Sequence, residues 1–541
     1  MIKKNCKSHL LNIYLALLCI NLFTITGCGN LNSGNNLNPS GVTPPSEDNP
    51  PTDNVMPIIN IISKTGKNDF VEKPKSKVTQ PNIPQWIGGG FFGPQAPEPY
   101  YEDCTITVYD VNGKVDLEKI PGQVKVRGNW TTSYDKKPLK IKFDEKQTML
   151  GLNKNTKFKK WVLTASYKDW SFLRDPTAYY MFKLIAPDYY ASDYQLVEVF
   201  VNGTYWGVYL LVEQQEAKKK RINISSPEDN YTGTDIGYLL EMDNYSSYEE
   251  DNFKFSMNYL NSLKDKNGAS VSNLTRDYTI KSDVYDNAQT KFIQNYMNNL
   301  WKICYEAVYE HKYSEFDDDY NLKEMKFDSV AFTDDQEAVT QQKVLACVSK
   351  VIDIDSLVAT YILNEVCCDA DIYYSSFYMD IDFGENKKKL TFEAPWDFDS
   401  GLGNKLHCAD AQGLYAGVSG YHVNYKESEK QQYSQKGYAN PWFIIFINCD
   451  WFQTKVKAKW ADIHSQNVLE KLTTQIDETS QKYVENFANN YKRWNNIGNN
   501  GSVGNELNNK AAACKTQKEA ADYLKDWLTK RFAALDGLWL N

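Results

Sequence analysis

Short runs of β-branched and aromatic residues, separated by turn residues, dominate the chain from residue 56 to about residue 242. In residues 139–143 apolar and basic positions alternate, so Lys140 and Lys142 share the face opposite the apolar one. Asn202-Gly203, the strongest two-residue hairpin signal, joins the runs 194–201 and 204–213. We therefore expect an antiparallel, strand-rich N-terminal part. Further strands are expected at residues 56–63, 105–109, 124–127, 161–165 and 237–242.

Apolar residues then take on helical spacing. Residues 355–368 predict a helix, two short strands follow at 377–381 and 390–394, and a capping box opens a helix at 516–537. An earlier helix is expected at Asp175, with this residue as its cap and a proline at its first position. Strands come first and helices last, so the predicted fold class is α+β.

Residues 245–343 interrupt this pattern, because Asp, Lys and Asn dominate there. We interpret the segment as a polar insertion that is helical around residues 288–311. The rest, from 56 to 541, is expected to form one large domain that carries this insertion.

The N-terminus predicts export. Three lysines precede an apolar stretch at residues 10–25, and no acidic residue occurs before Glu47. The stretch ends in Ile-Thr-Gly-Cys28, which resembles the lipobox of bacterial lipoproteins. We therefore expect a signal peptide at 1–27, a lipid anchor on Cys28 and a flexible tether at 28–55, in a membrane-anchored, extracytoplasmic bacterial protein. An ordinary signal peptide is the alternative.

Composition narrows the function classes. Hydrophobic residues make up 42% of the chain, which is typical of a globular protein. The net charge is −9, and it becomes −12 without the three lysines of the signal segment. This acidic balance argues against general binding of nucleic acid or of anionic lipid. Export permits disulfides, but the cysteines form no CxxC pair, and no HExxH motif occurs.

Two acidic motifs carry the candidate chemistry. Asp397 and Asp399 stand two apart in an aromatic frame at the end of a short apolar run, and Asp369-Ala370-Asp371 precedes them. Protein kinases need two separated acidic elements, one that orients the attacking hydroxyl and one that holds magnesium against the nucleotide phosphates. Paired aspartates also cap helices and turns, so this pattern alone is weak.

A series of short motifs runs in order along the chain. The series comprises Arg127-Gly128-Asn129, Lys136-Lys137-Pro138-Leu139-Lys140-Ile141-Lys142-Phe143, Trp161-Val162-Leu163, Phe172-Leu173-Arg174, Val197–Gly203, Gly207–Glu213, Gly237–Glu241, Asp369-Ala370-Asp371 with Ser375-Ser376, and Pro395-Trp396-Asp397-Phe398-Asp399. The ordered set resembles the spore coat protein H (CotH) family of secreted, atypical protein kinases, from about residue 56 to the C-terminus.

The resemblance implies an atypical protein-kinase-like fold that uses ATP and Mg²⁺ or Mn²⁺ to phosphorylate Ser or Thr of a secreted or surface protein. By position, Asp371 is the candidate that orients the hydroxyl. Asp397 is the metal ligand, with Asp399 as a second.

Other residues are expected around the nucleotide. Arg127, Lys140 and Lys142 are candidates for phosphate contacts, and Glu213 is a candidate partner for one of the lysines. Phe392 or Trp396 is expected to pack on adenine.

Three departures from the family pattern leave alternatives open. Trp130-Thr131-Thr132 stands where small serines are expected, Asp369 where Asn is usual, and Tyr374 where Arg is common. The second hypothesis is therefore a catalytically inactive surface module that binds protein or polysaccharide. A third is a glycosidase in which Asp371 and Asp397 form the carboxylate pair.

Overall fold

The computed structural model describes residues 38–39, 42–45, 56–72, 100–260, 263–271, 273–327, 334–419, 438–498, 503 and 506–540. The predicted signal peptide 1–27 and Cys28 lie outside the described residues, as does most of the predicted tether 28–55. Within the described part of the chain, no helix has both the length and the apolar character needed to cross a membrane.

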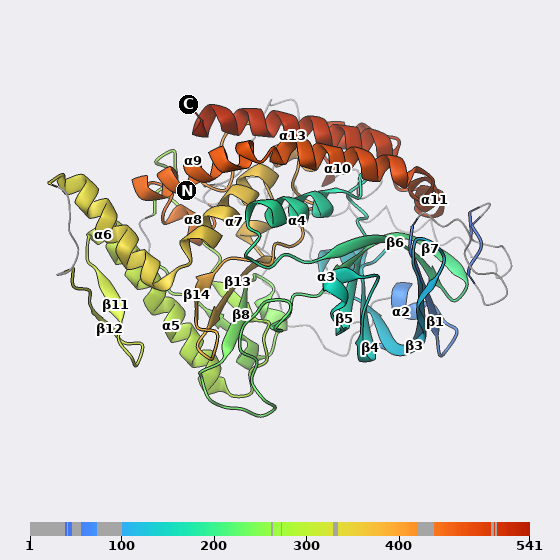
Figure 1. Cartoon of the computed structure of the whole chain (residues 1–541), viewed down its shortest axis with the longest axis horizontal. Coiled ribbons are helices and arrows are strands. Elements are labelled where there is room, and N and C mark those ends of the chain that lie inside the picture. The colour runs from blue at the N-terminus through green and yellow to red at the C-terminus, as the bar shows by residue number, and fades with distance from the viewer. Residues whose placement is uncertain are drawn as a thin grey trace, which may run out of the picture.

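Seven strands of the N-terminal part form a closed barrel in the order β1-β2-β3-β4-β5-β7-β6 (Figure 1). Neighbours are antiparallel except β1 and β6, whose parallel pairing closes the barrel. Their inward apolar side chains form one buried cluster. The strands are β1 (Ile58–Ser63), β2 (Glu102–Tyr109), β3 (Val115–Val126), β4 (Leu139–Gln147), β5 (Phe158–Thr164), β6 (Tyr194–Val201) and β7 (Thr204–Glu213).

The β6–β7 hairpin confirms the prediction made from its turn. Asn202 and Gly203 have φ values of 48° and 79°, the left-handed conformation that this two-residue turn requires. The Asn202 side chain also accepts a hydrogen bond from the Ser63 backbone N–H at 2.8 Å. The turn is therefore joined to the end of β1, where the barrel closes.

A second, antiparallel sheet has the order β14-β13-β8-β10-β9. Two of its strands, and helix α5, come from the polar segment 245–343, and α5 buries one face in the main core. This segment is therefore built into the sheet and the core. The strands are β8 (Gly237–Met242), β9 (Lys254–Ser256), β10 (Asp277–Ile280), β13 (Phe377–Asp382) and β14 (Lys388–Thr391), and a separate hairpin consists of β11 (Ser314–Phe316) and β12 (Leu322–Glu324).

The C-terminal part is mainly helical, as predicted. Helix α7 packs against α4, α9 and α13, and the long helices α9, α10 and α13 lie along one side of the molecule (Figure 1). The helices are α2 (Asp69–Glu72), α3 (Leu152–Asn155), α4 (Arg174–Ile185), α5 (Asn287–Tyr305), α6 (Gln336–Val351), α7 (Ile354–Cys367), α8 (Pro441–Ile444), α9 (Asp450–Ser465), α10 (Val468–Lys482), α11 (Val484–Trp494), α12 (Asn509–Ala513) and α13 (Gln517–Trp539).

A buried ion pair fastens α13 to α7. The Arg531 guanidinium lies 3.1 Å from the Glu365 carboxylate, and neither side chain is exposed. Glu365 also accepts hydrogen bonds from the backbone N–H groups of Tyr415 and Gly417, at 2.6 and 2.7 Å. One carboxylate thus joins two helices and the loop 415–417.

Replacing Arg531 with alanine would leave the Glu365 charge buried without its partner. We expect Arg531→Ala to lower the free energy of unfolding by about 3–5 kcal/mol. Urea unfolding followed by circular dichroism measures the change.

The matched control is Lys525→Ala on the same helix, because Lys525 pairs with Asp477 at the surface. That exposed pair should contribute about 0–1 kcal/mol. Equal losses in the two variants would contradict the importance assigned to the buried pair.

Candidate active site

A cleft of about 1220 Å³ lies between the barrel and the second sheet. Its lining includes residues of β4 and β5 on the barrel side and the end of β8 on the other. The loop 127–134 and the turns that follow α7 and β14 complete the walls. A volume of this size accommodates a nucleotide-sized ligand, since small-molecule sites are typically about 300–1,000 Å³.

Helix α7 delivers Asp371 to this cleft. The helix ends at Cys367, and Cys368 adopts a left-handed conformation with φ of 49° that turns the chain. Asp371 opens the following short helical turn, Asp371–Tyr373, and lines the cleft half-buried. The predicted helix at 355–368 therefore ends where its acidic motif begins.

Asp397 and Asp399 reach the same cleft from the segment after β14. Asp397 has φ of 66°, a left-handed conformation that aspartate tolerates better than most residues. Both carboxylates line the cleft, together with Trp396. The structure thus brings the three predicted aspartates, Asp371, Asp397 and Asp399, into one cavity.

A buried lysine that the sequence reasoning did not single out lies among them. The Nζ atom of Lys168, in the loop after β5, is 2.8 Å from Asp399 Oδ1 and donates a hydrogen bond to Ser400 Oγ at 2.8 Å. Burial alone would lower the pKa of Lys168, but Asp399, and more weakly Asp397 and Asp371, raise this pKa well above its ordinary value. Lys168 therefore stays charged.

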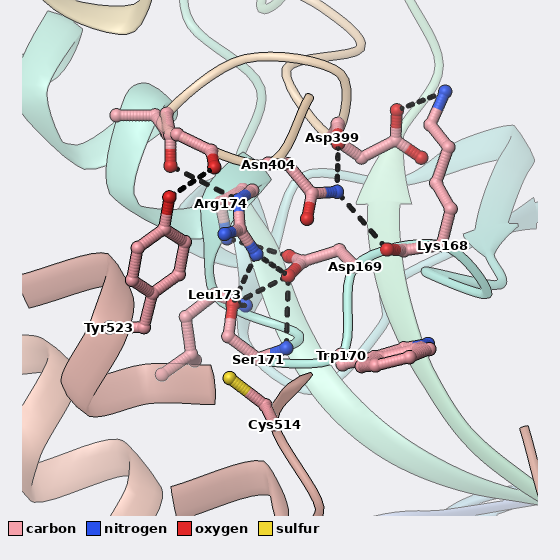
Figure 2. A network of polar contacts seen from close by, with 12 residues as sticks. Lys168, Asp169, Trp170, Ser171, Leu173, Arg174, Asp399, Asn404, Cys514 and Tyr523 are labelled. Atoms are coloured by element: carbon pink, nitrogen blue, oxygen red, sulfur yellow. Dashed lines mark hydrogen bonds and ion pairs between the residues drawn. The ribbon is translucent and has the colours of Figure 1, made fainter. Parts of the chain in front are cut away.

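A polar network holds the Lys168 and Asp399 loops together (Figure 2). The Arg174 guanidinium pairs with Asp169, next to Lys168, and its Nε donates to the Leu402 carbonyl at 3.3 Å. The Asn404 amide donates to the carbonyls of Lys168 and Asp399, at 3.1 and 2.7 Å. The backbone around the ion pair is therefore fixed on both sides.

Helix α13 supports the same network. The Tyr523 hydroxyl donates to the Gly403 carbonyl at 2.7 Å (Figure 2), and the Asn508 amide contacts Gly403 and Asn404. The C-terminal helices thus stabilise the loop that carries Asp399.

The aspartates repel one another. Burial raises the pKa of Asp399, the Lys168 charge lowers it and the Asp397 charge raises it. The result is a pKa of about 6. Burial followed by the Asp371 charge raises the pKa of Asp397, and burial raises that of Asp371 against the pull of Lys168 and Lys405. Negative charge therefore exceeds what the two lysines neutralise, and the site favours a cation.

Asp175 adds a buried carboxyl to this wall. It lies inside the first turn of α4, and its Oδ1 accepts a hydrogen bond from the Phe398 N–H at 2.7 Å. The prediction that Asp175 caps the helix is wrong. Leu173 stands at the cap position, and the Asp175 carboxylate accepts its hydrogen bond from the Asp397–Asp399 segment instead of from the helix. Burial and the charges of Asp399 and Asp397 raise its pKa well above the ordinary value.

Basic side chains line the barrel side of the cleft. Lys140 on β4 is half-buried there with Lys160 and Arg127. Burial, followed by the charges of Lys160 and Arg127, lowers the pKa of Lys140 to about 7. The Arg127 guanidinium lies 5.3 Å from the Trp396 ring centroid, so an aromatic contact holds it near the aspartates.

Three other candidate residues do not lie in the cleft lining. Lys142 is exposed on β4 and lies over the Tyr101 ring, at 5.8 Å from its centroid. Glu213 pairs with Arg221 at 3.1 Å instead of with a lysine of β4. Phe392 is fully buried in the main core, where its ring packs near Phe377 and Trp442.

The donor set suits a hard divalent cation shared with phosphate. Among the residues that the structure describes, no three His, Cys, Asp or Glu side chains group closely enough to enclose a metal ion. Mg²⁺, however, keeps several waters and is usually bound through one or two carboxylates plus substrate phosphates. Asp397 and Asp399 supply such carboxylates, and a bound cation would stabilise their ionised forms, which burial and then the neighbouring aspartates disfavour.

His407 lines the cleft two residues after Lys405, whose charge also acts on its ring. It is buried, its Nε2–H donates to the Cys368 carbonyl at 2.9 Å, and its ring packs near Tyr415. Burial, against this hydrogen bond, lowers the pKa of His407 to about 3. The seven cysteines with described side chains are all buried free thiols.

Residues 124–535 match a family model described as CotH kinase protein. Among curated proteins, no sequence matches the chain.

Because the pKa of His407 is lowered in the folded protein, the free energy of unfolding depends on pH. Between pH 6.5 and 3 the unfolded chain binds a proton on this residue that the folded chain excludes, so stability is lost as pH falls through this window. We expect His407 to account for about 2–3 kcal/mol of the loss between pH 7.5 and 4.5.

The test compares urea unfolding of the wild type and His407→Gln at pH 7.5 and 4.5. Gln keeps an N–H donor but does not titrate, so the variant should lose less stability on acidification. An equal loss in both proteins would show that His407 does not contribute to acid sensitivity.

Proposed function

The chain belongs to the CotH kinase protein family, and from this premise we propose that it transfers the γ-phosphate of ATP to Ser or Thr of a secreted or surface protein. The observation that carries the proposal is the convergence, in one cleft, of Asp371, Asp397 and Asp399 with Lys168 on one wall and basic side chains on the other. The arrangement of a strand-rich part and a helical part on either side of this cleft supports an atypical kinase-like fold.

Phosphoryl transfer requires in-line positioning and neutralisation of charge rather than covalent chemistry. In this proposal Asp397 and Asp399 hold Mg²⁺ or Mn²⁺, which neutralises phosphate charge when bound. Asp371 accepts the proton of the attacking hydroxyl, and its raised pKa makes it a stronger base than an ordinary aspartate. A kinase needs both acidic roles in one cavity.

The cationic side chains contact the phosphates in the same proposal. Arg127 and Lys140 approach from the barrel, and Lys168 and Lys405 from the aspartate side. Trp396, near Arg127 and stacked 6.2 Å from Tyr179, positions the guanidinium. Lys168 also fixes Asp399 through their ion pair.

We also propose that the protein acts outside the cytoplasm as a lipoprotein anchored through Cys28. The basic start, the apolar stretch 10–25 and the Ile-Thr-Gly-Cys28 sequence support export. Mass spectrometry of the membrane fraction should find Cys28 as a lipidated N-terminus, and a Cys28→Ser variant should not be retained by the membrane.

Phosphate transfer is tested with the purified chain, γ-labelled ATP, Mg²⁺ or Mn²⁺ and a panel of secreted proteins as acceptors. We expect transfer by the wild type and a loss of at least about 100-fold in Asp371→Asn and in Asp397→Asn, since each removes a group required in the transition state.

The matched control is Asp318→Asn, because Asp318 is exposed and lies outside the cleft lining. It should transfer phosphate at the wild-type rate. A wild type that gains thermal stability with ATP and metal but transfers no phosphate would favour the inactive binding module.

Lys140 makes nucleotide affinity depend on pH. With a pKa near 7 it loses its charge as pH rises, so the wild type should bind ATP more weakly at pH 8.5 than at pH 6.5. Lys140→Arg keeps the charge throughout and should lose affinity several-fold less over the same range. Titration calorimetry of both proteins measures the ratio, and identical pH profiles would refute a phosphate contact by Lys140.

A further inference from the structure

A second groove, of about 530 Å³, is lined by residues of the polar segment 245–343. Helix α5, the chain near Asn258 and the turn between β11 and β12 form its walls, and it shares no lining residue with the catalytic cleft. The proposed kinase chemistry gives this groove no role.

Unpartnered amide groups gather at this groove. The side chains of Asn258, Asn295, Asn299 and Asn321 line it, and none of them makes a hydrogen bond with the described part of the chain. Asn298 differs, because its amide donates to Gln294 and accepts from the Asn258 N–H. Four amides thus retain both a donor and an acceptor for a ligand.

Aromatic side chains accompany the amides. Phe292 and Tyr320 line the groove half-buried, with ring centroids 5.6 Å apart in an edge-to-face arrangement. Trp301 lines it too, and its fully buried Nε1–H has no acceptor among the described residues. Aromatic rings thus stand among the amides of the lining.

The groove has no net charge. Its charged lining residues are Lys302, whose Nζ lies 3.7 Å from Glu306, and the exposed Asp319. An ionic ligand would therefore find no excess of opposite charge, although the whole chain is acidic.

We propose that this groove binds a neutral oligosaccharide. Amides match the paired donors and acceptors of adjacent sugar hydroxyls, and aromatic rings pack against the apolar C–H faces of sugar rings. Such a site would hold the protein on a polysaccharide surface independently of phosphate transfer.

Titration calorimetry of the purified chain with neutral cello-, xylo-, malto- and manno-oligosaccharides of four to six units tests the proposal. At least one series should bind, and the double variant Asn295→Ala/Asn299→Ala should weaken that binding at least about tenfold. These side chains are exposed or half-buried and make no hydrogen bond with the described chain, so the melting temperature should stay unchanged.

Asn223→Ala is the matched control, since Asn223 is an exposed asparagine outside the groove, and it should bind as the wild type does. Asp397→Asn should also bind the sugar normally, which separates this site from the proposed kinase reaction. The proposal is overturned if none of the four series binds, if the double variant binds as tightly as the wild type, or if a neutral peptide competes for the groove where sugars do not.

Discussion

The buried ion pair between Asp169 and Arg174 is the interaction on which the candidate site depends. Arg174 reaches across to the Leu402 carbonyl, so the loop after β5 and the loop after Asp399 share one cation. The ion pair between Lys168 and Asp399 is formed by these two loops. The charge of Lys168 would be costly to bury without this support, because a charged group in a protein interior is unfavourable unless it is paired. The site thus forms where the loop after β5 of the barrel is joined to the loop that follows Asp399.

The electrostatics of the cleft are divided between its two walls. Burial and mutual repulsion raise the pKa values of Asp175, Asp397 and Asp399, while burial and neighbouring cations lower that of Lys140. The aspartate wall therefore holds more carboxylates than Lys168 and Lys405 neutralise, and the barrel wall brings Lys140 close to two other cations. A ligand that combines a divalent cation with a polyphosphate would relieve both at once, whereas a neutral ligand would relieve neither.

The sequence predicts those parts of the structure that depend on local chemistry. The Asn202-Gly203 turn, the alternation around Ile141 and the helix before Asp371 are local patterns, and the structure has them as expected. Closure of the barrel is different, because β1 and β6 are far apart in sequence and no turn specifies their pairing. Lys168 lies in a stretch of mixed polar and aromatic residues without a recognisable motif, and only its burial beside Asp399 distinguishes it. Arg221 follows three consecutive lysines, a pattern that predicts a solvent-exposed segment. Its side chain is nevertheless buried and pairs with Glu213.

The parallel pairing of β1 with β6 has a mechanical consequence. β1 is also antiparallel to β2, so it is hydrogen-bonded along both edges and completes the barrel. Tension applied through the N-terminal segment would reach the domain along the axis of β1. Backbone hydrogen bonds lie across the strand axis, so a force along β1 would load its hydrogen bonds to β2 and to β6 in shear. Many of these bonds would then have to break together instead of one at a time. A domain pulled from this end is therefore loaded through a strand that is hydrogen-bonded along both of its edges.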